Sequence, residues 1–334
     1  MVLLFCFLRL ASKNYSYSEL QETQQMLTTQ TTQRSSKPKN LKGVNFSERV
    51  CIEGIIDELA KSAKDPYAAS LSLIASAGLG DEQCYNATCT QILGMLNTLD
   101  KKPNDCPQWM RNNSFKAWMF GRVLLAADNM SDAKIVDQTK TRLSSLLEEK
   151  LTNEDNYAFF TWAQGYRAAL NNAEYEASKK RMIADSLQLS EKYKTEPTDH
   201  GALSDALWAW VMDLSACANA NDKQGYELVK QQIKSLTGTE SVSKALATGL
   251  LRRVDSNDYP AWALAKAHLA AATMLDKELY QDIDNALISF IESSKKAGTK
   301  AEYVLAVVDS QLAIQAGKEL QAKTNPRPMA GTGM

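Results

Sequence analysis

Four tryptophan-led segments of similar plan constrain the fold of this chain more than any other feature of its sequence. The intervals between successive tryptophans are 44, 48 and 52 residues, so the repeat is degenerate and its period drifts. Recurrence at this length is typical of stacked helical units. The segments are WMFGRVLLAADNMSDA from Trp118, WAQGYRAALNNAEYEA from Trp162, WVMDLSACANANDKQG from Trp210 and WALAKAHLAAATMLDK from Trp262.

Each segment follows the same physical plan. A tryptophan heads a helix, small residues or leucine follow at helical spacing, and a bend with Asn or Asp arrives about eleven residues later. Asn and Asp suit such bends because their side chains accept the free backbone N–H groups of the next helix. We therefore predict an αα-hairpin in each unit, with an amphipathic second helix. The apolar stripes of the second helices are Ile135, Val136, Leu143, Leu146 and Leu147; Met182, Ile183, Leu187 and Leu189; Tyr226, Val229, Ile233 and Leu236; and Leu279, Ile283, Leu287 and Ile291.

Small residues explain how such hairpins stack. Alanines after each tryptophan allow helices to approach closely, and the tryptophan fills the wider gap at the other end. Hairpins that bury their faces only on their neighbours form a solenoid or a curved αα superhelix. The pattern resembles the general class of helical-repeat proteins, although the 34-residue period of tetratricopeptide repeats is not met. Only eight prolines and fifteen glycines interrupt the chain, which is predicted to be all-α with about 12 helices.

The composition along the chain predicts four regions. Residues 1–42 combine an apolar N-terminus with a Ser-, Thr- and Gln-rich flexible tether, because they offer almost nothing to bury. Residues 43–110 form a helical cap with clustered cysteines, and residues 111–322 hold the hairpins and a closing helix from Lys300. Residues 323–334 form a disordered tail. Within the cap, helices are expected near residues 47–63, 67–78 and 87–100.

Four of the six cysteines lie between residues 51 and 106. Their spacing does not match a structural zinc site, and we expect no metal. Among three possible connectivities we predict bridges joining Cys84 to Cys89 and Cys51 to Cys106; the alternative is a set of small, buried, reduced thiols. With the short apolar run at the N-terminus as a signal remnant, these bridges indicate a periplasmic or secreted protein, and the cytoplasm is the alternative.

Charge and motif content exclude several classes of function. The formal net charge of −1 leaves no basic surface for nucleic acid, and the N-terminal apolar run is too short to span a bilayer. No phosphate-binding loop is present, and no cofactor is expected. The two histidines weigh against imidazole-based catalysis. We expect His200 at the surface and His268 inside the fold with a hydrogen bond.

Two acidic residues stand at apolar helix positions. Asp213 lies three residues after Trp210, where two other units carry glycine, and Asp309 lies in LAVVDSQL. An αα-barrel enzyme acting on a glycan would use such a pair as general acid and base. Full barrels need about six hairpins, and the sequence shows four or five. The alternative is that each Asp caps a helix, bonds to a Tyr or Trp, or faces solvent.

Aromatic residues offer a binding surface instead. Trp208 and Trp210 point roughly 200° apart on one helix, so they cannot both be buried on a single face. One of them either packs on the next repeat or faces the concave surface as a partner contact, and Tyr157 and Tyr259 lie in similar aromatic groups. We favour a non-enzymatic helical-repeat scaffold, adaptor or assembly component that binds a protein or peptide partner through these four residues on its concave surface. The glycan-cleaving αα-barrel is the alternative.

Overall fold

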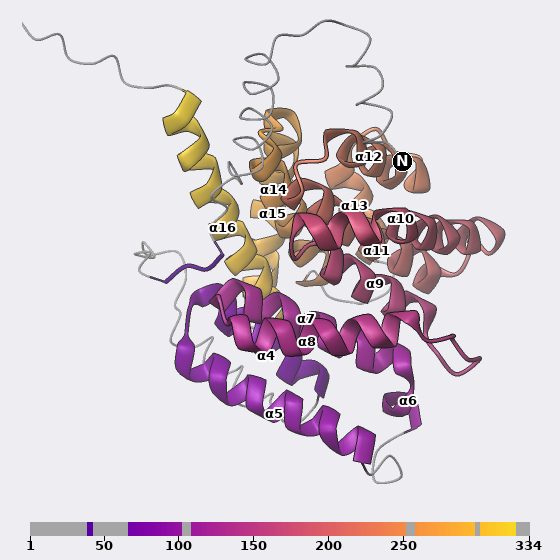
Figure 1. The fold of residues 1–334 in the computed structure, drawn as a ribbon. Coiled ribbons are helices and arrows are strands. Elements are labelled where there is room, and N and C mark those ends of the chain that lie inside the picture. Colours follow the sequence, from indigo (N-terminus) through magenta and orange to yellow (C-terminus); the bar gives the residue numbers. More distant parts are fainter. Residues whose placement is uncertain (1–38, 43–65, 102–107, 252–257, 298–300, 325–334) are drawn as a thin grey trace, which may run out of the picture. The chain divides into compact units, whose positions relative to one another are not determined.

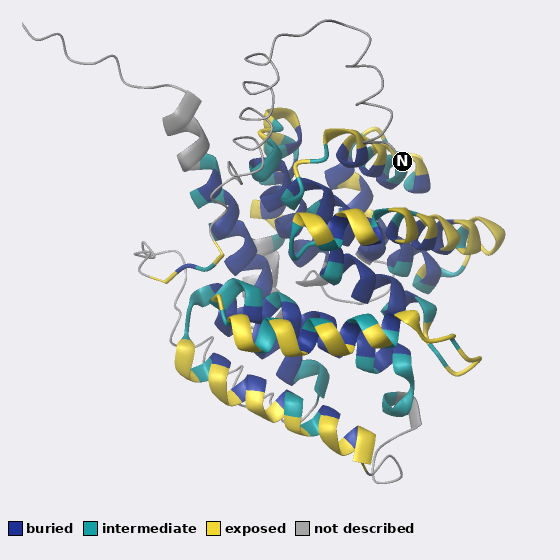
Figure 2. Ribbon diagram, viewed as in Figure 1, coloured by how far each residue is buried: buried dark blue, intermediate teal, exposed yellow. Residues whose placement is uncertain are grey.

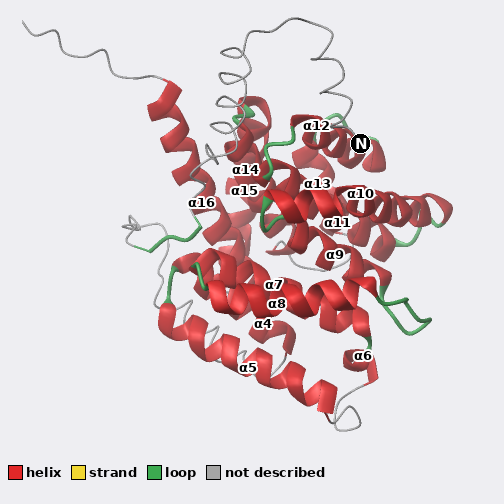
Figure 3. Cartoon of the chain, in the orientation of Figure 1, coloured by secondary structure: helices red, strands yellow, loops and turns green. Residues whose placement is uncertain are grey.

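The computed structural model describes residues 39–42, 66–101, 108–251, 258–297 and 301–324. These residues form helices and loops and contain no strand (Figure 3). They hold twelve helices of ten or more residues and one helix of four residues. The predicted all-α class is confirmed.

Six helices form an inner layer in which each packs against the next. In order of contact they are α4 (Pro66–Leu79), α7 (Asn113–Met130), α9 (Tyr157–Ala168), α11 (His200–Asn219), α14 (Asp258–Met274) and α16 (Ala301–Thr324). Helix α16 then packs against α4, so the circuit of inner-helix contacts is closed (Figure 1). The inner helices α7, α11 and α14 are buried on nearly every side (Figure 2), which explains why their sequences show no single apolar stripe.

The outer helices each pack against the inner helix that precedes them in the chain. These contacts are those that the predicted αα-hairpins require. Most of the predicted apolar stripes face the inner layer, as Val229 and Ile233 do, but Leu187 is 38% exposed. The outer helices are α5 (Glu82–Lys101), α8 (Ala133–Glu148), α10 (Asn172–Thr195), α12 (Lys223–Thr237) and α15 (Lys277–Ala297), and α6 (Gln108–Arg111) and α13 (Val242–Leu251) lie in the connections.

Four of the five hairpins turn through the same two-residue motif, a residue with left-handed backbone followed by Asp. The Asp N–H bonds to the carbonyl five residues earlier, which closes the inner helix. The Asp carboxylate then accepts the N–H three residues later, which caps the outer helix. The predicted capping role of Asn and Asp is confirmed, and the fifth hairpin uses Asn171. The motif residues are Gly80–Asp81, Ser131–Asp132, Asn221–Asp222 and Leu275–Asp276.

The capping aspartates also join neighbouring outer helices. Tyr85 of α5 donates to the Asp132 carboxylate at 3.2 Å, and Tyr175 of α10 donates to Asp222 at 2.6 Å. Lys179 bonds to the same oxygen of Asp222. Each carboxylate therefore ties the start of its own helix to the preceding outer helix, which fixes the register of adjacent units.

Residues 39–42 lie against two hairpin turns and not in the predicted tether. The Leu41 N–H donates to the Gly78 carbonyl at 2.8 Å, and the Leu41 side chain is 1% exposed. Lys39 pairs with Asp128 at 3.0 Å on the next turn. The tether was predicted because residues 1–42 offer almost nothing to bury, but the buried Leu41 side chain supplies an apolar contact at the end of this region. Among the described helices, none is long and apolar enough to cross a bilayer.

Candidate functional site

Of the two alternatives for Trp208 and Trp210, packing on the next repeat is the one found, and neither side chain faces outward. Both side chains are 0% exposed. Trp208 packs against Trp262 of α14 with ring centroids 4.6 Å apart, and Trp210 donates its indole N–H to Ser190 of α10 at 2.9 Å. The prediction assumed one buried face, whereas α11 is surrounded by α9, α10, α12, α13 and α14. These tryptophans therefore join α11 to α14 and α10 in the interior of the fold.

The predicted partner contact Tyr157 on α9 makes hydrogen bonds within the fold. Tyr157 is partly buried, and its hydroxyl bonds to Asp185 at 2.7 Å and to Gln188 at 2.8 Å, both on α10. Burial and the Asp185 contact raise the pKa of the Tyr157 hydroxyl. The Tyr259 side chain lies outside the described residues. Among the three described residues of the predicted aromatic surface, only Tyr157 is partly exposed.

Asp213 faces α10, where the structure buries it completely. Its side chain is 0% exposed, and within the described part of the chain neither carboxylate oxygen has a hydrogen-bond partner. Burial raises the pKa of Asp213 well above its ordinary value; the Ser186 hydroxyl opposes this rise and the Asp185 carboxylate adds to it. Burial therefore favours the neutral form of the Asp213 side chain over the charged form.

Asp309 lies in a different interface, between α16 and α14. It accepts the Trp262 indole N–H at 3.1 Å and pairs with the Lys266 ammonium group at 3.3 Å. The expected alternative role, a bond to a tryptophan N–H, is confirmed for this residue. Asp213 packs on α10 and Asp309 on α14, and the two share no partner among the described residues. The hydrogen-bond and ion-pair contacts of Asp309 lie within the packing of α14 and α16, and the use of the two carboxylates as an acid–base pair stays a prediction.

The predicted bridge between Cys84 and Cys89 is not formed. Both thiols are free, and both lie on α5. Five residues along a helix rise about 7.5 Å at 1.5 Å per residue, which exceeds the roughly 7 Å between Cα atoms that a disulfide tolerates. Cys51 and Cys106 lie outside the described residues. The periplasmic or secreted location, which was inferred in part from these bridges, stays a prediction.

The two histidines lie in different surroundings. His268 is 0% exposed, as expected, but neither ring nitrogen has a hydrogen-bond partner in the described ranges. Its ring packs on Tyr280 at 4.0 Å between centroids, and burial lowers the pKa of His268 to about 4. His200 is exposed at the start of α11. No three His, Cys, Asp or Glu side chains of the described residues converge as metal ligands.

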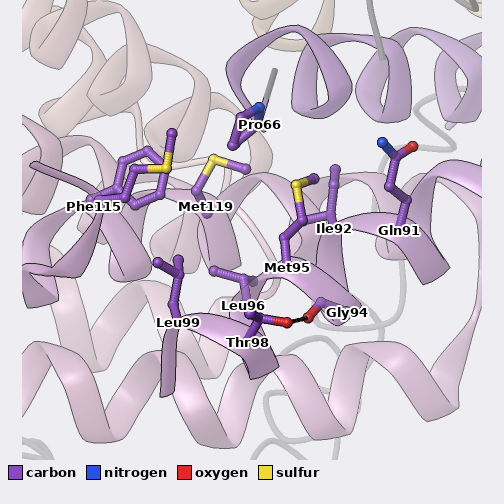
Figure 4. Close-up of a pocket in the computed structure, with 11 residues that line it drawn as sticks. Pro66, Gln91, Ile92, Gly94, Met95, Leu96, Thr98, Leu99, Phe115 and Met119 are labelled. Carbon is purple, nitrogen blue, oxygen red and sulfur yellow. Dashed lines mark hydrogen bonds between the residues drawn. The ribbon is translucent and has the colours of Figure 1, made fainter. Parts of the chain in front are cut away.

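An apolar pocket of about 450 Å³ lies between α4, α5, α6 and α7 (Figure 4). Its walls come from the second half of α5 and the first two turns of α7, while Pro66 and Met110 close its ends. No charged side chain of the described residues lines it. The described lining residues are Pro66, Gln91, Ile92, Gly94, Met95, Leu96, Thr98, Leu99, Met110, Phe115 and Met119.

Local sequence explains why a pocket forms here. Met95, Met110 and Met119 are unbranched and flexible, so they line a cavity without filling it rigidly. Gly94 adds no side chain, and a Cβ placed there would contact nothing within 4 Å. Thr98 turns its hydroxyl to the Gly94 carbonyl at 3.0 Å, which presents its methyl group to the surroundings. Sequence reasoning missed the site because these residues come from four separate helices.

This chain matches no protein-family model, curated protein or solved structure with which it was compared. Its function is therefore argued from the site alone. The pocket is a site of ordinary ligand size, since small-ligand pockets occupy about 300–1,000 Å³ and are mostly apolar. None of its described lining residues carries an ionisable side chain.

Proposed function

We propose that this chain is a non-enzymatic helical-repeat binding protein, whose protein partner inserts apolar side chains into the pocket between α4, α5, α6 and α7. The observation that carries the proposal is the apolar, charge-free lining of the pocket. The proposal keeps the interaction role expected from the sequence and moves it from the buried tryptophans to this pocket.

The lining favours a protein segment over a charged small molecule. A fatty acid or a phosphorylated ligand would have no described charged partner in the pocket. Apolar side chains of an amphipathic helix need none, and methionine-rich grooves adapt to such helices. Met95 is only partly buried on α5, so a partner helix would contact it directly.

The partner's contact with Met95 provides the test. A protein captured from the native cell extract is purified and its dissociation constant is measured with the full chain. Met95→Glu should weaken binding by about 10- to 100-fold, because it places a charge against apolar side chains of the partner. Leu228→Glu is the matched control, since Leu228 is 44% exposed on the remote helix α12.

Equal losses for both variants, or no loss for Met95→Glu, would refute the pocket as the binding site. Native mass spectrometry of the purified chain tests whether an apolar small molecule occupies the pocket instead of a protein. If an apolar small molecule copurifies with the wild-type chain and is lost in Met95→Glu, a small-molecule carrier replaces the protein scaffold. Circular dichroism of each variant confirms that the helical fold is kept.

A further inference from the structure

Two inner helices each carry a buried tryptophan with a buried cationic side chain four residues later. In α14, Trp262 is followed four residues later by Lys266, and in α7 Trp118 is followed four residues later by Arg122. The cation lies near the tryptophan ring in both cases, at 5.6 Å for the Lys266 ammonium nitrogen and 4.0 Å for the Arg122 guanidinium carbon. Residues four apart share one helix face, so each pair presents an indole N–H beside a cation.

One of these pairs is satisfied by a carboxylate. The same oxygen of Asp309, on the neighbouring inner helix α16, accepts the Trp262 indole N–H and pairs with the Lys266 ammonium group. A buried cation and a buried indole N–H are thereby compensated together. This geometry shows which chemical group fits between a tryptophan and a cation at these repeat positions.

The other pair lacks that carboxylate. The Trp118 indole nitrogen and the Arg122 Nε are buried, and no described residue accepts a hydrogen bond from either. Arg122 is 2% exposed and has no carboxylate within ion-pair distance in the described part of the chain. Its only described polar contact is Ser70, whose hydroxyl lies 2.5 Å from an Arg122 terminal nitrogen. A buried guanidinium in this state is costly unless an anion compensates it.

We infer that Trp118 and Arg122 form a binding site for a carboxylate supplied by a ligand, in the place that Asp309 fills beside Trp262 and Lys266. The guanidinium fork suits a carboxylate better than a spherical anion, because it donates in one plane. Tyr67 and Phe159 are partly exposed, and their rings flank Trp118 at 5.8 and 4.3 Å between centroids. The site therefore lies one aromatic layer below the surface.

The indole N–H resonances of a ¹⁵N-labelled full chain test this site directly. Titration with sodium acetate at constant ionic strength should move the Trp118 resonance and saturate in the millimolar range. Trp118→Phe assigns that resonance by removing it. The Trp162 resonance is the internal control, because its indole N–H already donates to the Asp205 carbonyl at 3.2 Å.

The Arg122→Gln variant should abolish the saturable shift while the control resonance stays in place. If that variant does not fold, Arg122→Lys should keep the charge and weaken acetate binding at least tenfold. A tripeptide with a free C-terminus, compared with its amide, distinguishes a peptide carboxylate from a small-molecule one. The inference is overturned if acetate and the peptide leave the Trp118 resonance unmoved, or move all indole resonances alike. It is independent of the proposed function, because neither residue lines the apolar pocket.

Discussion

Replacing Gly165 by alanine tests how closely the inner helices approach. A Cβ at Gly165 would lie 2.6 Å from the Met212 Cβ of α11 and 3.8 Å from the Met212 carbonyl carbon. The Met212 Cβ is fixed to its backbone, so the contact cannot be relieved by rotating the end of a side chain. Helices α9 and α11 must separate, or the helix must distort.

The magnitude follows from two opposing terms. Overpacking a close contact costs about 1–3 kcal/mol, and alanine improves helix propensity over glycine by about 1 kcal/mol. Because the contact is far inside van der Waals distance, the cost falls near the top of its range. We expect Gly165→Ala to lower the free energy of unfolding by about 1–2 kcal/mol.

Gly94→Ala is the matched control, since a Cβ there meets nothing within 4 Å. Only the propensity term remains, so this variant should raise the free energy of unfolding by about 0.5–1 kcal/mol. Urea denaturation followed by circular dichroism measures both variants. The reasoning is refuted if Gly165→Ala is neutral, or stabilises the fold as much as Gly94→Ala does.

Three further predictions concern the backbone, a buried base and the thiols. Leu275 has a φ of 62° and is 52% exposed, so Leu275→Gly should stabilise the fold by about 0.5–1 kcal/mol in the same denaturation assay. The pKa of His268 is about 4 when folded against 6.5 for the free group, so the unfolded chain binds the extra proton between these values. Stability should be full above about pH 6.5 and fall by up to about 3 kcal/mol towards pH 4, a loss that His268→Gln lacks. Thiol titration of the denatured, unreduced chain should find at least the three free cysteines of the described residues, and a lower count contradicts the unpaired state.

Local signals in the sequence were sufficient to predict the helices and the capped turns between them. Asn and Asp at the bends act through backbone N–H groups two or three residues away, so their capping role depends on neighbouring residues alone. The stripes of α12 and α15 follow from a period of 3.6 residues, and their described side chains are buried as expected. The bonds from Tyr85 and Tyr175 to capping aspartates 47 residues later were missed, although their equal spacing is a signal that a repeat alignment of the outer helices would have found.

The predicted binding role of Trp208 and Trp210 depended on which helices surround α11, and the sequence does not give those neighbours. Trp208 and Trp210 lie on opposite sides of α11, and only the packing of five neighbouring helices shows that both sides are interior. The buried face of α10 contains Ser178, Ser186 and Ser190, which an apolar-stripe rule cannot detect. Polar residues can occupy a core when tertiary partners are present, and sequence periodicity does not name those partners.

The sequence by itself determined the helical class, the hairpin unit and its capped turns, because these depend on interactions within a few residues of the chain. The tertiary structure decided that α16 returns to α4 and closes the circuit of inner helices, since that contact joins the first and the last of the described helices. It also decided that Asp309 satisfies Trp262 and Lys266 while Trp118 and Arg122 have no equivalent carboxylate among the described residues. Whether a buried donor is satisfied depends on a residue from another helix, and sequence spacing does not contain that information.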